Sequence, residues 1–248
     1  MTSPEILVII PARGGSKGIP RKNIRPFAGY PLIAFSIAAG LACRRVSRVI
    51  VSTDDEEIAE IARRHGAETP FLRPGGLAAD NVTDLPVFQH ALSWLGENEN
   101  YHPDLVIHLH ATSPVRPLDC LDRGIQLMLV HPDVECVRSV IPPSQNPYKM
   151  WHVKEQGGLM TPILQVEGLD EPFNTPRQQL PPVFLQTGHT NVIQAKTILG
   201  GSMTGRLIMP LMIDPAYEID LDTLEDWQYG EWVVANRKLD MIWPEKTV

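Results

Sequence analysis

The chain is poor in cysteine and has no long apolar run. Its 248 residues include three cysteines, Cys43, Cys120 and Cys136, without any Cys-x-x-Cys pair. This odd set argues against a disulfide framework and against a cysteine-based zinc site. The first apolar run, residues 6–10, is far shorter than the ~20 residues of a membrane span, and charges rather than a cleavage site follow it. We therefore expect a cytoplasmic protein with reduced thiols, no membrane span and no targeting segment.

Each of two long stretches lacks one sign of charge. The chain has 29 acidic residues and 22 Lys and Arg, so its formal net charge of −7 disfavours general nucleic-acid binding. No acid occurs between Glu5 and Asp54, where eight bases lie, and no base occurs between Arg206 and Arg237, where seven acids lie. The two stretches could meet around an anion and its metal ion, although solvated helix faces would give the same pattern.

Short apolar strands alternate with helical segments along most of the chain. This alternation predicts an α/β fold, with a mostly parallel sheet and helices on both of its faces. The expected strands are 6–10, 48–53, 104–111, 135–141, 184–195 and 206–213, and the expected helices are 31–42, 56–65, 84–95, 118–130 and 223–237.

Proline and glycine interrupt this alternation between residues 142 and 183. We expect one domain over residues 1–248, in which 142–183 is an inserted subdomain that serves as an acceptor lid or an oligomer contact.

The loop after the first strand carries the strongest chemical signal. Residues 11–23 read Pro-Ala-Arg-Gly-Gly-Ser-Lys-Gly-Ile-Pro-Arg-Lys-Asn, beyond the carboxyl end of a strand, where doubly wound folds bind ligands. The glycines let backbone N–H groups approach an anion, and Arg13, Lys17 and Lys22 can neutralise its charge. Neither the P-loop pattern nor the dinucleotide fingerprint is present. The loop therefore predicts a phosphate site of another type.

Four elements of the sequence resemble the acylneuraminate cytidylyltransferases, also called CMP-N-acetylneuraminate or CMP-nonulosonate synthetases. They are residues 11–23, Ser52-Thr53-Asp54, Thr112-Ser113-Pro114 followed by Arg116, and Ile219-Asp220-Leu221-Asp222-Thr223. The resemblance implies a Rossmann-like three-layer α/β/α nucleotidyltransferase with a small inserted dimerisation or acceptor subdomain. Such an enzyme joins CTP to a sialic-acid-like (nonulosonic) acid sugar, giving the CMP-sugar and pyrophosphate, uses Mg²⁺ and acts as a homodimer.

The resemblance also implies roles for individual residues. Those expected to take part in catalysis are Arg13, Lys22, Asp220 and Asp222. Those expected to bind the nucleotide are Arg13, Gly14, Ser16, Lys17, Lys22, Asn23 and, by a looser match, Arg73. Those expected to contact the acceptor are Thr112, Ser113, Lys149 and Arg177 and, at two positions where the sequence departs from the family pattern, His110 and His189; surface ion pairs are the alternative for Lys149 and Arg177.

Asp220 and Asp222 are the expected magnesium ligands. Two carboxylates at alternate positions of an extended segment face the same side, and with phosphate oxygens and waters they form a typical magnesium shell. The alternative is that one or both cap the helix that begins near Leu224. Glu225 and Asp226 suit the first turn of that helix and are expected to be structural.

Two histidines mark a departure from the family pattern. Where sialate enzymes usually read Leu-Gln-Pro-Thr-Ser-Pro, residues 109–114 read Leu-His-Ala-Thr-Ser-Pro, so His110 replaces an acceptor-binding glutamine. His108 lies on the same strand face as His110, but no third zinc ligand has a recognisable spacing. We expect His108 to be structurally satisfied and His110 to contact the acceptor.

Two other functions stay open from the sequence. The first is a nucleotidyltransferase for a different sugar or a sugar 1-phosphate, using CTP, GTP or UTP. The second is a non-catalytic nucleotide-binding module, which the presence of both Asp220 and Asp222 disfavours.

Overall fold

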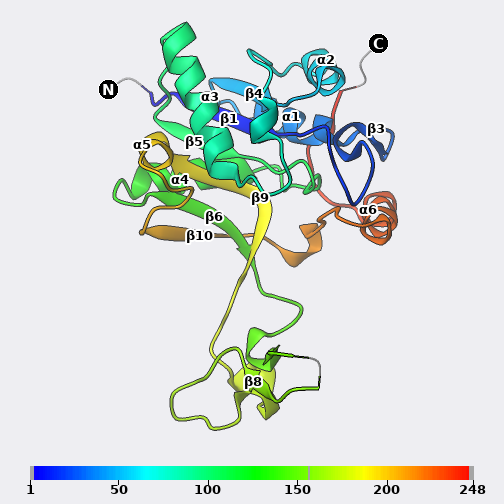
Figure 1. Cartoon of the computed structure of the whole chain (residues 1–248), viewed down its shortest axis with the longest axis vertical. Helices are drawn as coiled ribbons and strands as arrows, with labels where there is room; N and C mark the ends of the chain where they lie inside the picture. The colour runs from blue at the N-terminus through cyan, green and yellow to red at the C-terminus, as the bar shows by residue number, and fades with distance from the viewer. Residues whose placement is uncertain (1–2, 156, 246–248) are drawn as a thin grey trace. The chain divides into compact units, whose positions relative to one another are not determined.

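The apolar segments of the sequence assemble into a six-stranded sheet in the order β10-β6-β9-β5-β1-β4 (Figure 1). In this computed structural model, residues 3–155 and 157–245 are described. The chain divides into two compact units, the first formed by Met1–Ser139 and Thr187–Val248 and the second by Val140–Gln186. The second unit contains the whole of the predicted segment 142–183.

The sheet and helices of the first unit follow the predicted alternation closely. The strands of the sheet are β1 (Ile6–Pro11), β4 (Arg48–Ser52), β5 (Leu105–His108), β6 (Cys136–Ile141), β9 (Leu185–Gln194) and β10 (Ile208–Met212). The helices are α1 (Leu32–Ala42), α2 (Glu56–Arg64), α3 (Asp84–Glu99), α4 (Cys120–Val130), α5 (Ala195–Leu199) and α6 (Leu224–Asn236).

Shorter elements complete the described residues. A small antiparallel pair is formed by β2 (Pro26–Phe27) and β3 (Tyr30–Pro31), and a second by β7 (Trp151–Val153) and β8 (Met160–Pro162). Single 3₁₀ turns are η1 (Lys22–Ile24), η2 (Gly75–Leu77), η3 (Pro147–Lys149), η4 (Pro172–Asn174), η5 (Arg177–Gln179) and η6 (Pro215–Tyr217).

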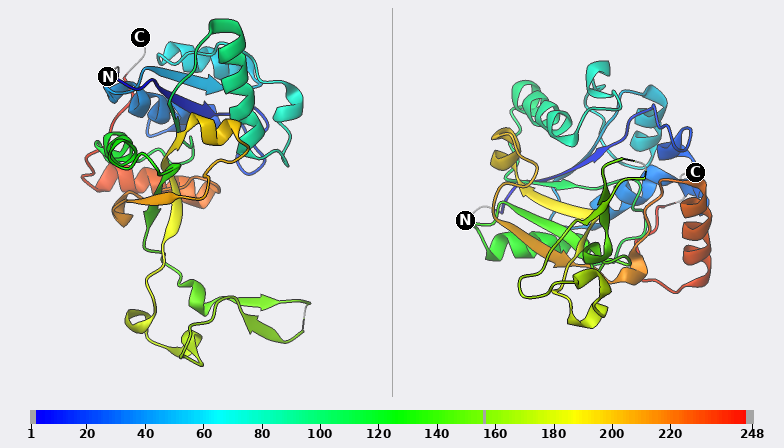
Figure 2. Two further views of the ribbon diagram at one scale, coloured as in Figure 1. Left: turned by 90° about the vertical axis from the view of Figure 1, so that its left-hand side faces the viewer. Right: turned by 60° about the horizontal axis from the view of Figure 1, so that its bottom comes forward.

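Helices cover both faces of the sheet. Strand β1 is central, pairing in parallel with β4 and β5, and β9 runs antiparallel to β5. Alternate residues of β1 point to opposite faces: Leu7 packs in a buried cluster with Phe88 of α3 and Ile198 of α5. On the other face, α1 lies so close that a Cβ at Gly40 would come within 2.9 Å of the Val49 side chain. This confirms the predicted three-layer α/β/α arrangement (Figure 2).

The ends of α2 show how local sequence sets the boundaries of a helix. The Asp55 side chain accepts a hydrogen bond from the Ile58 N–H at 3.0 Å, which satisfies one of the unpaired donors of the first turn. Gly66, directly after the helix, has φ of +89°, a conformation that glycine adopts without a steric penalty. The predicted cap and stop signals are confirmed.

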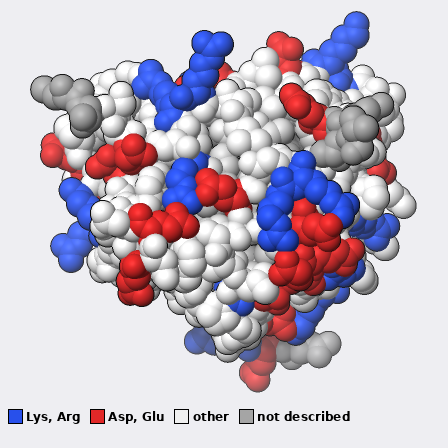
Figure 3. All heavy atoms as spheres, turned by 90° about the horizontal axis from the view of Figure 1, so that it is seen from above, with Lys and Arg blue, Asp and Glu red and all other residues white. Residues whose placement is uncertain are grey.

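The charge asymmetry of the sequence is partly neutralised in the fold. Arg21 contacts Asp55 and Glu57, and Arg48 contacts Glu68 and Glu99. On the face shown in Figure 3, basic and acidic side chains lie next to one another. Several bases of the acid-free stretch therefore pair with acids from beyond it, which leaves fewer of them for an anionic ligand.

No helix among residues 3–155 and 157–245 is both long enough and apolar enough to span a bilayer.

Candidate active site

The loop after β1 is held in place by backbone and side-chain hydrogen bonds. Ala12 donates its N–H to the Ser52 carbonyl at 2.9 Å, and the Asn23 amide donates to the Arg13 carbonyl at 3.0 Å. Arg21 has φ of +55° and precedes η1, so the chain turns back and brings Asn23 beside Arg13. The fold therefore positions the predicted phosphate loop at the carboxyl end of the sheet, the usual ligand side of such folds.

This loop lines a cavity of about 340 Å³ together with the acidic carboxy-terminal stretch. We call it the loop cavity; its lining residues are Pro11, Arg13, Ser16, Lys17, Gly18, Lys22, Asn23 and Asp222. The Lys22 ammonium lies 2.8 Å from Asp222 Oδ1 and 3.0 Å from the Leu221 carbonyl oxygen. A Cβ at Gly18 would come within 2.8 Å of the Asp222 carbonyl oxygen. The basic and acidic stretches thus meet at one cavity.

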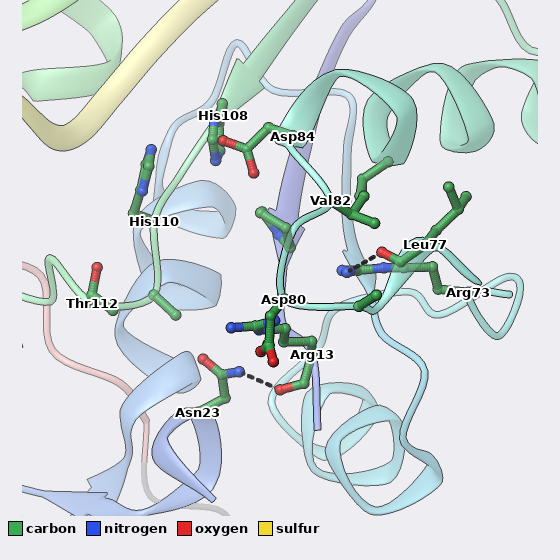
Figure 4. Close-up of a pocket in the computed structure, with 14 residues that line it drawn as sticks. Arg13, Asn23, Arg73, Leu77, Asp80, Val82, Asp84, His108, His110 and Thr112 are labelled. Atoms are coloured by element: carbon green, nitrogen blue, oxygen red, sulfur yellow. Dashed lines mark hydrogen bonds and ion pairs between the residues drawn. The ribbon is translucent and has the colours of Figure 1, made fainter. Parts of the chain in front are cut away.

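A second cavity of about 280 Å³ shares Pro11, Arg13 and Asn23 with the first. We call it the inner cavity; its other lining residues are Arg73, Leu77, Ala79, Asp80, Val82, Asp84, Val87, His108, His110, Ala111 and Thr112. Figure 4 shows these side chains, with Arg13 and Asn23 at one end and the histidines at the other. The two cavities provide room for an anionic ligand with a less charged portion.

Asp80 holds two of the predicted phosphate ligands. Its carboxylate accepts a hydrogen bond from Arg13 at 2.7 Å and also contacts the Lys17 ammonium. The hydrogen bond from Lys17 is the largest of the effects that lower the pKa of Asp80. An entering polyphosphate would compete with this carboxylate for both cations, so Asp80 is a residue of the site that the sequence did not indicate.

Arg73 reaches the inner cavity from the loop after α2. It is buried, and its guanidinium donates hydrogen bonds to the hydroxyl and the carbonyl of Ser52. Burial lowers the pKa of Arg73, although an arginine remains charged at neutral pH. These bonds fix a buried positive charge at the cavity wall, in a position to recognise an electron-rich group.

Gly14 is placed differently from the prediction. Its N–H donates to Asp54 Oδ1 at 3.0 Å, and a Cβ at this position would come within 2.7 Å of the Asp55 carboxylate. Gly14 lines neither cavity. The glycine is required by the close approach of Asp55, the N-cap residue of α2, and its N–H is taken by Asp54.

Asp220 and Asp222 do not cap α6. Thr223 is the N-cap residue, and its hydroxyl and the Asp226 carboxylate form a reciprocal capping box. The pKa of Asp220 is raised, mainly because protein atoms surround part of its carboxylate, although the residue also reaches solvent. The negative charge of Asp222 raises this pKa further. The Thr112 hydroxyl donates a hydrogen bond to Asp220 and opposes the shift. Neither carboxylate therefore has a capping role; Asp222 instead forms an ion pair with Lys22.

His110 and His189 are joined through Arg116, a buried residue with 1% of its surface exposed. The Arg116 guanidinium donates to the His189 carbonyl at 2.7 Å and to the His110 carbonyl. These bonds fix the backbone of His110 at the inner cavity, whose wall its ring lines; its contact with the acceptor remains a prediction.

His189 does not reach either cavity. Its Nε2 lies 2.9 Å from the Tyr217 carbonyl oxygen, which can only accept, and its Nδ1 lies 2.9 Å from the Thr187 hydroxyl. Burial lowers the pKa of His189 to about 4, so the ring is neutral. Ser113 is also buried and lines neither cavity. Both placements differ from the predicted acceptor contacts and indicate structural roles.

A protein-family model described as Cytidylyltransferase matches residues 7–131 of this chain. A CMP-N,N'-diacetyllegionaminic acid synthase of Legionella pneumophila is 33% identical over 228 residues, which is 91% of this chain and 94% of that protein. This chain belongs to the cytidylyltransferase family. It is therefore a nucleotidyltransferase, in agreement with the resemblance found in its motifs.

Other members of the cytidylyltransferase family match in part or in fold. A pseudaminic acid cytidylyltransferase of Campylobacter jejuni is 44% identical over 120 residues, covering 48% of this chain and 51% of that protein. The solved structure of a CMP:2-keto-3-deoxy-manno-octonic acid synthetase complexed with CTP superposes with a TM-score of 0.68, at 16% identity, over 93% of this chain and 98% of that one. At this level of identity, the similarity to the solved structure shows the fold alone.

His108 was expected to have hydrogen-bond partners for its ring nitrogens, and the structure of this cytidylyltransferase contradicts that expectation. The residue is 2% exposed, and its Nε2 has no hydrogen-bond partner among the described residues. Burial is the main cause that lowers the pKa of His108 well below its usual value. The Asp84 carboxylate, at the first turn of α3, approaches the two histidines. Sequence spacing gave no sign of Asp84 because it lies 24 positions before His108.

Lys149 and Arg177 belong to the second unit. The Lys149 ammonium donates to the Phe173 carbonyl at 3.2 Å, and Arg177 donates to the Pro143 carbonyl at 2.6 Å. Neither is found in an ion pair among the described residues. Their predicted role toward the acceptor remains a prediction.

Proposed function

We propose that this cytidylyltransferase joins CTP to a sialic-acid-like (nonulosonic) acid sugar, giving the CMP-sugar and pyrophosphate. The observation that carries the proposal is the contact between Lys22 and Asp222, 200 residues apart in the chain and 2.8 Å apart in space. This contact brings the loop that we assign to the triphosphate and Asp222 of the acidic pair to one cavity. The names of the relatives support the same substrates, since they refer to legionaminic, pseudaminic and N-acylneuraminic acids.

The chemistry requires positioning and charge neutralisation. The anomeric hydroxyl oxygen of the sugar attacks the α-phosphorus, the bond from that phosphorus to the leaving pyrophosphate breaks, and the hydroxyl proton is lost. Arg13, Lys17 and Lys22 line the loop cavity and would neutralise the triphosphate, with Ser16 as a further donor. Correct placement of the two reactants contributes much of the rate of such a transfer.

The inner cavity would hold the remainder of the nucleotide and the reacting end of the sugar. Asn23 and Arg73 line the side near the loop, and we assign them to the nucleoside. His110 and Thr112 line the opposite side, and we assign them to the acceptor. A neutral His110 can exchange hydrogen bonds with sugar hydroxyls, because burial is the main cause that lowers its pKa.

We propose that Asp220 and Asp222 hold Mg²⁺. The residues fit a hard cation: both are carboxylates, they stand at alternate positions of one extended segment, and neither caps a helix. When bound, Mg²⁺ neutralises phosphate oxygens as charge moves to the leaving pyrophosphate. Lys22, which contacts Asp222, would then move its ammonium toward the phosphates.

We also propose that the enzyme is a cytoplasmic homodimer. The three cysteines are unpaired and buried, and burial raises the pKa of Cys120 to about 12 and of Cys136 to about 11, as suits thiols in a reducing compartment. Several large apolar side chains of the second unit are exposed, among them Leu159 at 92% and Met160 at 56%. A partner subunit would cover them. Measurement of the mass in solution tests the dimer.

The test of the activity is a substrate panel. The enzyme is incubated with Mg²⁺, one of CTP, GTP and UTP, and one of several nonulosonic acids or sugar 1-phosphates, and pyrophosphate is measured. We expect release with CTP and an acid sugar only. Absence of release from every combination would refute the activity, and release with a sugar 1-phosphate instead would move the function to that acceptor class.

A further inference from the structure

Three side chains able to bind a metal ion meet where β5 ends and α3 begins. They are Asp84, His108 and His110, and their ligand atoms all lie within 4.8 Å of one another. Figure 4 shows the Asp84 carboxylate facing the His108 ring, with the His110 ring alongside, at the end of the inner cavity away from Arg13. The nucleotide and magnesium assignments use neither Asp84 nor His108.

The state of His108 is an independent sign of a missing ligand. The residue is 2% exposed and lines the inner cavity, and its Nε2 has no hydrogen-bond partner among the described residues. A buried polar atom without a partner destabilises the folded protein. The ring packs on Phe88, with centroids 4.6 Å apart, and stacks on His110, with centroids 4.1 Å apart and planes at 19°. The unpartnered nitrogen of His108 can accept a ligand that enters the cavity once the two stacked rings tilt apart.

We propose that Asp84, His108 and His110 bind a divalent transition-metal ion of the Zn²⁺ type. Imidazole nitrogens favour Zn²⁺ and its neighbours over Mg²⁺, which prefers oxygen ligands. Two imidazoles with one carboxylate form a donor set that leaves at least one coordination position for another ligand. The site is thus distinct in chemistry from Asp220 and Asp222, which offer oxygen atoms alone.

Small side-chain movements complete the geometry. Tetrahedral zinc with bonds of about 2.0–2.1 Å separates its ligand atoms by about 3.3 Å. In this structure the ligand atoms of the three side chains lie within 4.8 Å of one another. Asp84 is exposed and lies in the first turn of α3, so its carboxylate can rotate inward. The imidazole rings must tilt apart, because a metal lies in the plane of each ring that binds it. The backbone of His110 stays in place through Arg116.

Because His108, His110 and Asp84 all line the inner cavity, a ligand in that cavity could take the open coordination position. There the metal would accept an oxygen atom of the acid sugar. This role rests on the proposed function, whereas the metal site itself does not, so metal binding is measured first and without any substrate.

Zinc binding is measured by calorimetric titration of the full chain in the presence of excess Mg²⁺, and Co²⁺ is used as a spectroscopic probe. We expect one Zn²⁺ per chain and a Co²⁺ spectrum typical of mixed nitrogen and oxygen ligands in a site of low coordination number. Asp84→Asn and His110→Gln should each weaken Zn²⁺ binding at least tenfold. The matched controls are Asp133→Asn and His131→Gln, both at exposed positions outside the cavities.

Each outcome decides for or against the site. Circular dichroism and urea unfolding establish that the variants are folded, and His110→Gln introduces the residue that the sialate enzymes usually carry.

Retention of the Co²⁺ spectrum in Asp222→Asn supports the assignment of the metal to Asp84, His108 and His110, and loss of the spectrum there would move the metal to Asp220 and Asp222. Failure of the wild-type chain to bind Zn²⁺, or unchanged binding in both Asp84→Asn and His110→Gln, would overturn the proposal. Pyrophosphate release with Mg²⁺ alone is read separately, so the proposed function stands or falls on its own.

Discussion

Replacement of Lys22 by methionine removes the ammonium group that connects the phosphate loop to the acidic pair, while it keeps most of the aliphatic side chain. In the free protein this ammonium contacts Asp222 at 2.8 Å and the Leu221 carbonyl at 3.0 Å. In the proposed complex it contacts the triphosphate. We expect Lys22→Met to weaken CTP binding without a large loss of stability.

The expected loss of CTP affinity follows from two contacts of Lys22, the one that it makes with the triphosphate and the one with Asp222 that it leaves. A hydrogen bond to a charged group contributes about 1.5–3 kcal/mol. The contact that Lys22 leaves is worth about 0–1 kcal/mol, since the Asp222 side chain is 70% exposed and solvent screens the pair. The difference, about 0.5–3 kcal/mol, corresponds to about 2- to 150-fold in the dissociation constant. Because the Lys22 side chain is only 15% exposed, we expect the upper half of this range, a loss of about tenfold or more.

The dissociation constant of CTP is measured by calorimetry with Mg²⁺ and no acceptor, for the wild-type protein, for Lys22→Met and for Lys238→Met. Lys238 is an exposed residue after α6 and serves as the matched control. A dissociation constant of Lys22→Met within twofold of the wild-type value, in a folded variant, would refute the assignment of Lys22 to the triphosphate.

Three further predictions concern the site and the groups that support it. Asp222→Asn should abolish turnover and retain the fold and much of the CTP binding, and Glu225→Gln, in the first turn of α6, is its control; wild-type turnover in Asp222→Asn would refute the metal role. The pKa of His189 is lowered from its usual 6.5 to about 4, so the ring stays neutral in the folded protein. The folded protein therefore loses stability as the pH falls from about 6.5 toward 4, because in this range the unfolded chain takes up a proton at this histidine and the folded chain does not. That loss is about 3 kcal/mol, and urea unfolding of His189→Gln should show a correspondingly weaker pH dependence; an equal dependence would contradict it. Arg116→Met should lower the free energy of unfolding by about 1–3 kcal/mol, because it removes the side-chain donor to the His189 carbonyl and one of the donors to the His110 carbonyl, which also accepts from the Ser36 hydroxyl; a change below about 0.5 kcal/mol in chemical denaturation would count against this role.

The regular part of the fold was predictable because local patterns determine it. Continuous apolar strands, the cap at Asp55 and the stop at Gly66 each depend on a few neighbouring residues, and all agree with the structure. The position of the loop at residues 11–23, at the carboxyl end of the sheet, was predictable for a similar reason, since the loop directly follows β1.

The misplaced and missed residues depend on contacts between distant segments. Asp80 and Asp84 come from an irregular stretch and the start of a helix, and only the folded chain brings them to Arg13 and the histidines. Gly14 was expected to face a ligand, but Asp54 takes its N–H. His189 was expected in the acceptor pocket, but β9 lies inside the sheet, where its neighbours Thr187 and Tyr217 occupy both ring nitrogens.

The central claim is that the two cavities transfer a cytidylyl group to an acid sugar. Its most direct test is to follow CTP, Mg²⁺ and the active nonulosonic acid together by mass spectrometry and by pyrophosphate assay. We predict that CMP-sugar and pyrophosphate form in equal amounts, and that neither forms in Asp222→Asn. Consumption of CTP without any CMP-sugar, or equal product formation by the variant, would contradict the account.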